Sequence, residues 1–510
     1  MLFNSLDYFA FLGLTLAGFW AIRFLGPERD DGPRTRGAWL RLLFVFLASC
    51  AFYMAWNWRY IGLILFSTLL DYCAGLGIHA AKSSRAKKAW LGLSLAGNLG
   101  LLGVFKYFNF FSEATGDVLS LFGVAIHAPV LDVLLPVGIS FYTFQTLSYT
   151  IDVYRGRLEP VRNPIEFAFY VTFFAQLVAG PIVRASELLP QLRRPPWLDR
   201  ERVGHGLFLI AIGLIKKVIL ADFVSVNLVD RVFADPSAFS GTETIIGLYA
   251  FTLQIYADFS GYTDVARGSS LLFGIELPEN FDRPYQATSV AEFWRRWHMT
   301  LSTWLRDYLY FPLGGSKSGE LRTYFNLYLT LFLIGLWHGA SWTFVIYGNL
   351  QAAAVMWNRY LVRERAARRG PTRPSSVYLL ASAWNRLNDL LRGGLDRDPL
   401  WLTAVKVLLT MQFVVFSRIL FRATGLDNAE LVASRVVSGT WSVAQVSTEL
   451  WGVLLAGFVL HYLPRSWLES LRSRFVQLPP WAQGIALALV GVVLAIFVTA
   501  EAVPYIYFQF

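Results

Sequence analysis

The sequence predicts an all-α polytopic integral membrane protein. Hydrophobic residues make up 55% of the 510 positions and charged residues only 16%, whereas a soluble domain carries about 25% charged residues. The mean hydropathy is +0.45. Many apolar runs approach the length of a membrane-spanning helix, and together they predict about 11 to 13 membrane helices, some of them re-entrant. No long polar linker divides the chain, so we expect a single domain over residues 1–510.

The positive charge is arranged in a way that predicts the topology. A net charge of +10 would suggest nucleic-acid binding in a soluble protein. Here the cations gather in short loops between apolar runs, as they do on the cytosolic side of membrane proteins. The loops 26–38 and 81–88 are basic, whereas the loop 112–130 contains no lysine or arginine. This alternation predicts that both termini lie on the outer side, and we expect no nucleic-acid partner.

Four regions follow one another along the chain. Residues 1–130 hold the N-terminal spans, and residues 131–358 form the core. Residues 359–398 form a basic cytosolic loop with a peripheral helix, and residues 399–510 hold the C-terminal spans. Within this last region we expect spans at 400–421, 449–463 and 481–500, joined by loops at 423–447 and 464–474.

Two stretches of the core are more polar than an ordinary span. Pro136 and Gly138 interrupt the first, which then carries Gln145; it is either a kinked span or the lining of a cavity. The second, YADFSGYTD, lies between two apolar runs and carries Asp258 and Asp264. Carboxylates so close to the hydrocarbon mark either a functional site or the caps of an interfacial turn.

Residues 291–311 are predicted to form one amphipathic helix, which lies at the interface or re-enters the membrane. The arginines on its polar side can meet either substrate phosphates or lipid headgroups. His298 falls on the apolar side and is either structural or functional. That side holds Trp294, Trp297, His298, Leu301, Trp304, Leu305 and Tyr308, and the polar side holds Arg295, Arg296, Thr303, Arg306 and Asp307.

His338 follows a run of 14 almost purely apolar residues and precedes GASW. Small residues around it, among them Gly335 and Gly339, permit a close approach of helices or of a ligand. An imidazole inside a span is costly, and its ordinary pKa suits it to general-base work at neutral pH. The alternatives are a structural role and a proton pathway. The charge pattern predicts that the chain enters before His338, turns there, and returns to the cytosol.

Other catalytic signatures are absent from the sequence. There is no GxSxG, no P-loop and no HExxH, and the two cysteines lie apart in apolar segments. No ligand spacing supports a metal site, so we expect none. No internal repeat of the transporter kind is found. What remains is transfer to a hydroxyl, assisted by a buried histidine.

At these residues the sequence resembles the membrane-bound O-acyltransferases, especially the bacterial branch that acetylates alginate. The resemblance covers nearly the whole chain. It rests on LPVGISFYTFQTLSYTIDVYRG (135–156), FFAQLVAGPIVR (173–184), DFSGYTDVARG (258–268), ENFDRPY (279–285), EFWRRWHMTLSTWLRDYLYFPLGG (292–315), GLWHGASW (335–342) and the terminal YFQF. Each motif alone is weak, but the combination is specific.

The resemblance implies a ring of helices around a central catalytic tunnel. It implies that His338 is the catalytic histidine, and that His298 is a second one, which orients the donor or stabilises the oxyanion. A direct transfer and an acyl-histidine intermediate both remain open. We expect the motifs to bind substrate through Trp294, Arg295, Trp304, Arg306, Asp307, Tyr310, Gln145, Asn280 and Trp337.

The resemblance also implies the substrates and partners. The donor would be acetyl-CoA, with no metal. The acetyl group would cross the bacterial inner membrane to a periplasmic SGNH-type acetyltransferase, working with a polysaccharide synthase complex, for O-acetylation of an exopolysaccharide such as alginate. Both termini would then be periplasmic. Acylation of teichoic acid, peptidoglycan, cellulose or a lipid is the alternative, and a polysaccharide transporter is a more distant one.

Overall fold

The computed structural model describes residues 1–24, 36–124, 129–178, 180–369, 379–393, 397–498 and 505. The described residues form helices, turns and loops without a strand, which confirms the predicted all-α class. Five described stretches are long and apolar enough to cross a membrane: Leu6–Arg23, Gly37–Ala80, Ser84–Leu121, Leu400–Arg422 and Pro480–Phe497. The predicted basic loop 26–38 and the terminal YFQF lie largely or wholly outside the described residues.

The helices group into two compact units. Unit 1 comprises Met1–Phe223, Ile255–Glu279 and Pro464–Phe510, and unit 2 comprises Val224–Gln254 and Asn280–Leu463. The long helix α12 (Gly241–Leu272) contributes residues to both. Whether the chain folds as one domain, as the sequence predicts, stays a prediction.

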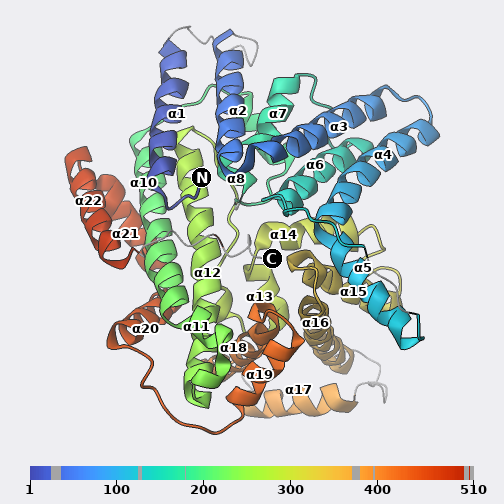
Figure 1. The fold of residues 1–510 in the computed structure, drawn as a ribbon, viewed down its shortest axis with the longest axis vertical. Coiled ribbons are helices and arrows are strands. Elements are labelled where there is room, and N and C mark those ends of the chain that lie inside the picture. Colours follow the sequence, from blue (N-terminus) through green and yellow to red (C-terminus); the bar gives the residue numbers. More distant parts are fainter. Residues whose placement is uncertain are drawn as a thin grey trace. The chain divides into compact units, whose positions relative to one another are not determined.

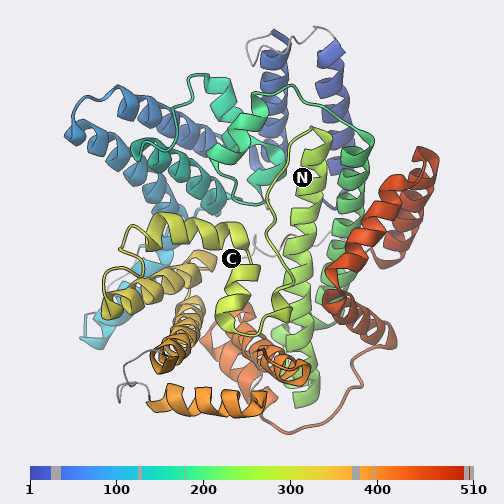
Figure 2. The ribbon, with the colours of Figure 1, turned by 180° about the vertical axis from the view of Figure 1, so that it is seen from behind.

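Unit 1 contains two pairs of neighbouring helices near the N-terminus. Helices α1 and α2 pack against each other, as do α3 and α4, and both views show the pairs side by side (Figure 1, Figure 2). The elements of unit 1 outside α12 are α1 (Leu6–Phe24), α2 (Arg36–Asn57), η1 (Trp58–Tyr60), α3 (Ile61–Ala80), α4 (Ser84–Leu102), η2 (Gly103–Tyr107), α5 (Phe108–Leu121), α6 (Ile139–Tyr154), α7 (Pro164–Thr172), α8 (Phe174–Leu177), α9 (Ala185–Leu192), α10 (Arg200–Ile215), η3 (Lys216–Asp222), α21 (Arg465–Gln477) and α22 (Pro480–Phe497).

Unit 2 is built around a helical hairpin of α15 and α16, which pack along each other (Figure 1). Its elements outside α12 are η4 (Ser225–Val229), α11 (Asp230–Ala234), η5 (Pro236–Ala238), η6 (Pro284–Gln286), α13 (Val290–Arg296), α14 (Met299–Leu305), η7 (Arg306–Tyr310), α15 (Glu320–His338), α16 (Trp342–Arg369), α17 (Leu379–Arg392), α18 (Leu400–Arg422), α19 (Leu426–Val436) and α20 (Thr448–Tyr462).

Several predicted helix boundaries agree with the structure. Helix α6 begins directly after Gly138, and the segment just before it is not helical. The φ of 77° at Gly138 is one that glycine adopts readily. The peripheral helix and the three C-terminal spans correspond to α17, α18, α20 and α22. The predicted loops 423–447 and 464–474 are wrong in part, because they contain α19 and α21. Both helices are short and amphipathic, a pattern that a search for long apolar runs does not detect.

The alternative of an interfacial turn at YADFSGYTD is also wrong, because α12 runs through it without a break. The carboxylates that suggested a turn are neutralised inside the helix bundle of unit 1. Lys216 pairs with Asp264 at 2.6 Å. Lys217 pairs with both Asp222 and Asp258 at 2.7 Å. Because ion pairing compensates their charge, these carboxylates can be buried inside a helix and need not lie at a solvated turn.

Glycines bring α10 and the second half of α12 into close contact. A Cβ added at Gly213 would meet the carbonyl oxygen of Gly261 at 2.6 Å, and one added at Gly268 would meet that of Gly206 at 2.5 Å. The two glycines on each helix are seven positions apart, so both contacts lie on one face. Small residues at this spacing let membrane helices approach backbone to backbone.

Candidate functional site

His298 occupies a sharp turn between two short helices. Helix α13 ends at Arg296 and α14 begins at Met299. His298 has φ 43° and ψ 56°, a left-handed conformation that is rare outside glycine. The predicted single helix over 291–311 is therefore wrong. The predicted division into an apolar and a polar side nevertheless agrees with the observed burial. All the residues assigned to the apolar side are buried, and Arg295 and Arg306 are exposed.

Asn280 holds this turn in place. Its backbone oxygen accepts a hydrogen bond from the Met299 N–H at 2.9 Å. Its side-chain oxygen accepts one from the Thr300 hydroxyl at 2.7 Å. A left-handed non-glycine residue costs about 1–3 kcal/mol and persists only where its surroundings impose it. The structure thus gives Asn280, which the sequence suggested as a substrate ligand, contacts that position His298.

The first turn of α13 is fixed by a charged cap. Glu292 accepts hydrogen bonds from the backbone N–H of Thr288 at 2.9 Å and from the Arg296 guanidinium at 2.7 Å. Burial acts to raise the pKa of Glu292, but these hydrogen bonds and the charge of Arg296 outweigh it and hold the pKa below its ordinary value. The cap therefore stays ionised at neutral pH and keeps α13 anchored before the His298 turn.

His338 is the last residue of α15, and α16 begins at Trp342. The hairpin therefore turns immediately after the imidazole, as predicted. The two helices touch one turn away, where a Cβ added at Gly335 would lie 2.6 Å from the Cα of Gly348. The prediction that Gly335 permits close helix approach is confirmed. This contact fixes the height of His338 relative to α16.

We expect Gly335→Ala to lower both stability and activity. The added methyl group collides with backbone at Gly348 and at the oxygen of Phe344, which is 2.7 Å away, so the helices must separate. Overpacking of this kind costs about 1–3 kcal/mol. Thermal unfolding in detergent measures the loss. Gly452→Ala in α20 is the matched control, since nothing lies within 4 Å of its added Cβ. Equal melting temperatures for the two variants would contradict the role of the Gly335 contact.

Aromatic rings bring the two histidines together. The Trp337 ring lies 5.6 Å from the His298 ring and 5.1 Å from the His338 ring, measured between centroids. Phe421 of α18 lies 5.0 Å from His338. His298 is 0% exposed and His338 is 1% exposed. Two imidazoles 40 positions apart in the sequence thus share one buried aromatic site in unit 2.

The other predicted site residues have different surroundings. The Trp294 indole donates to Gln351 at 3.1 Å, and Gln351 in turn donates to Ser417 of α18 at 3.2 Å, so this tryptophan links α13, α16 and α18. Trp304 is buried against Tyr308 at 5.1 Å.

The polar candidates contact other groups. Arg295 is exposed, and Arg306 pairs with its neighbour Asp307 at 2.8 Å. Tyr310 donates a long hydrogen bond of 3.4 Å to Ser316. Gln145 belongs to unit 1, where it donates to the oxygen of Tyr170 at 2.6 Å.

Arg418 is a residue that the sequence reasoning missed. It lies in α18, inside an apolar stretch that could span a membrane, and it is 1% exposed. Its guanidinium carbon is 4.8 Å from the Trp297 ring and 5.2 Å from the Phe421 ring. The signal was available, because an arginine in the run QFVVFSRILF is expensive in a membrane and marks function by default.

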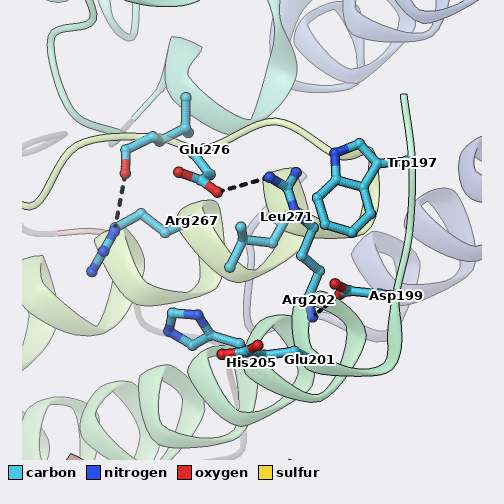
Figure 3. A pocket seen from close by; sticks show the side chains of 9 residues that line it. Trp197, Asp199, Glu201, Arg202, His205, Arg267, Leu271 and Glu276 are labelled. Atoms are coloured by element: carbon cyan, nitrogen blue, oxygen red, sulfur yellow. Dashed lines mark hydrogen bonds and ion pairs between the residues drawn. The ribbon is translucent and has the colours of Figure 1, made fainter. Parts of the chain in front are cut away.

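Unit 1 contains a separate cavity of about 330 Å³. Figure 3 shows Trp197 beside Arg202, whose guanidinium lies 4.3 Å from the indole ring and 3.1 Å from Glu276. Arg267, on the other side, pairs with Glu279 at 3.2 Å. Both arginines that line this cavity therefore have acidic partners.

Comparison with known proteins identifies the family. Residues 159–369, which include both histidines, match the model of the membrane-bound O-acyltransferase family. The chain is 38% identical over 468 residues to the probable alginate O-acetylase AlgI of Pseudomonas putida, covering 91% of this chain and 86% of that protein. The chain belongs to the membrane-bound O-acyltransferase family. It is therefore an O-acyltransferase and a multi-pass membrane protein, as the sequence predicts.

Other relatives in this family act on different polymers. The chain is 37% identical over 386 residues to the peptidoglycan O-acetyltransferase of Helicobacter pylori, covering 70% of each chain. It is 26% identical over 309 residues to the teichoic acid D-alanyltransferase of Bacillus subtilis, covering 58% of this chain and 70% of that one. Family members use an acyl donor. The described residues contain no cluster of three or more His, Cys, Asp or Glu side chains suited to a metal ion.

Proposed function

We propose that this O-acyltransferase moves an acetyl group from acetyl-CoA to a hydroxyl group, and that His338 and His298 carry the reaction. The observation that carries the proposal is the pair of buried imidazoles that both contact the ring of Trp337. His338 takes the proton of the acceptor hydroxyl, and the oxygen attacks the thioester carbonyl. His298 orients the donor. A general base must be the neutral imidazole, which is the form that accepts a proton.

The acceptor is a hydroxyl of an exopolysaccharide such as alginate, reached through a periplasmic SGNH-type acetyltransferase. The identity to the probable alginate O-acetylase over 91% of this chain supports this choice above peptidoglycan and teichoic acid. We place the protein in the inner membrane of a bacterium, with both termini in the periplasm. The charge alternation of the loops supports that orientation.

The test is transfer of a labelled acetyl group in cells. A strain that lacks the protein, complemented with wild type or with an inactive variant, is analysed by mass spectrometry of its polysaccharides and its lipids. Acetyl esters restored on a polysaccharide support the proposal. Esters restored on peptidoglycan, teichoic acid or lipids would move the acceptor to that polymer, and unchanged acetylation of all of them would refute acetyl transfer.

The left-handed turn at His298 allows a sharp test of that side chain. Glycine and asparagine both tolerate this backbone conformation, so His298→Gly and His298→Asn should fold like the wild type. We expect His298→Gly to lose about 10²-fold in rate, because nothing then orients the donor. His298→Asn keeps a hydrogen-bonding side chain and should retain more activity. The rate of CoA release from acetyl-CoA measures both, and equal rates for His298→Gly and wild type would exclude a catalytic role.

A further inference from the structure

Arg418 is a buried cation beside the histidine pair. Its side chain is 1% exposed, and its Nε and Nη2 atoms have no hydrogen-bond partner among the residues that the structure describes. A buried charge with unsatisfied donors is strongly unfavourable unless something compensates it. The rings of Trp297 and Phe421 supply only a cation–π contribution. These donors can therefore bind an anionic oxygen that the described residues do not supply.

The arginine one turn further along α18 behaves in the ordinary way. Arg422 donates to Asp230 at 2.7 Å and is thus neutralised by a carboxylate of the same unit. The contrast shows that α18 carries two arginines with different tasks. One forms an ion pair, and the other keeps two donors unpaired next to reactive groups.

The position of Arg418 points to the reacting centre. Phe421 contacts both the Arg418 guanidinium, at 5.2 Å, and the His338 ring, at 5.0 Å. Trp297, the other ring beneath the guanidinium, directly precedes His298 in the chain. Of the two rings that contact Arg418, Phe421 therefore contacts His338, and Trp297 is the neighbour of His298 in the chain. An anion held here would lie among the groups that we assign to the chemistry.

We propose that Arg418 binds the negatively charged oxygen that forms on the thioester carbonyl during acyl transfer. The inference rests on the proposed function. The hydroxyl oxygen forms a bond to the carbonyl carbon while its proton moves to His338, and the carbonyl π pair moves onto oxygen. Arg418 holds this oxyanion. When the C=O bond re-forms, the C–S bond breaks and the leaving thiolate takes the proton from His338. Arg418 is then a catalytic residue.

A guanidinium suits this task because it carries a permanent charge and a planar set of donors. Donors that are fixed before the reaction stabilise charge without having to reorganise, and the loss of one typically lowers kcat by about 10²–10³-fold. The effect falls on kcat rather than on donor binding, because the oxygen becomes negative only during the reaction.

The experiment compares purified wild type with Arg418→Met, Arg418→Lys and the control Arg422→Met. The first readout is kcat and KM for acetyl-CoA. We expect Arg418→Met to lower kcat by about 10²-fold or more, to change KM less than about threefold, and Arg418→Lys to recover part of the rate. Arg422→Met should stay near the wild-type rate. A kcat near wild type in Arg418→Met, or a rise in KM alone, would overturn the proposal.

The second readout does not depend on the donor. Acetate is an oxyanion that matches a guanidinium fork, so it should raise the melting temperature of wild type and of Arg422→Met but not that of Arg418→Met. An equal shift in all three would overturn the anion site. If wild type releases no CoA but acetate still stabilises only the proteins that keep Arg418, acetyl-CoA is not the donor. The anion site at Arg418 is then still supported.

Folding is controlled by the melting temperatures without acetate. Replacing a buried charge by an apolar side chain of similar length is often neutral or stabilising, so Arg418→Met should melt no lower than wild type. A large drop in its melting temperature would identify Arg418 as structural and overturn the proposal. If Arg418→Met does not accumulate in cells, Arg418→Lys tests the proposal instead. Acetate should raise the melting temperature of Arg418→Lys, and its kcat should be lower than that of wild type. An unchanged kcat would overturn the proposal.

Discussion

Replacing His338 by alanine is expected to lower acetyl transfer by about 10³-fold or more, since a positioned general base contributes about 10²–10⁴-fold. The imidazole is 1% exposed at the end of α15, between Trp337 and Phe421. The other histidine that contacts Trp337, His298, is held in its own turn. CoA release from acetyl-CoA and ester formation on the acceptor measure the effect.

His461 provides the control for this variant. It is a third buried histidine of unit 2, and its Nε2 accepts a hydrogen bond from the Tyr285 N–H at 3.2 Å. Its side chain and its backbone oxygen hold Tyr285 and Gln286 of η6. His461→Gln keeps an acceptor and should remain within about threefold of the wild-type rate. If His461→Gln and His338→Ala lost activity equally, the loss would be explained by the replacement of any buried histidine. That result would contradict a specific catalytic role for His338.

Replacing Lys217 by methionine is expected to destabilise the protein by about 3–5 kcal/mol, the range seen when one member of a buried ion pair is removed. Lys217 is 2% exposed and lies 2.7 Å from both Asp222 and Asp258. The variant removes the cation that Asp222 and Asp258 share, and Asn4 still donates to Asp222 at 3.1 Å. Thermal unfolding in detergent measures the loss.

Two further variants separate the charge from the packing. Lys216→Met is the neighbouring control: Lys216 is more exposed and meets only Asp264, at 2.6 Å, so its loss should cost clearly less. The triple change Lys217→Met, Asp222→Asn and Asp258→Asn removes all three charges and should recover much of the stability. Similar melting temperatures for Lys217→Met and Lys216→Met would contradict the buried triad.

The sequence was most informative where a property repeats along the chain. Apolar runs predicted the membrane class and the C-terminal helices α18, α20 and α22, because a span needs only length and hydropathy. The break after His338 was also predictable, since Gly335, Gly339 and Ala340 crowd around one histidine. These features depend on local composition alone.

What the sequence could not reveal depends on partners distant in the chain. The left-handed turn at His298 exists because Asn280 reaches Met299 and Thr300, which periodicity cannot show. Helix α12 continues through Asp258 and Asp264 because Lys216 and Lys217 of η3 neutralise them. Arg418 was visible as an arginine in an apolar run, but only the fold places it on Trp297 and Phe421.

The measurement that tests the two-histidine site most directly is a single turnover of acetyl-labelled CoA by purified protein. Wild type, His338→Ala and His298→Gly are mixed with the labelled donor and a hydroxyl acceptor, and their melting temperatures are recorded alongside. Transfer of the label by wild type alone, with similar melting temperatures for all three, is the predicted result. Transfer at the wild-type rate by either well-folded histidine variant would contradict it.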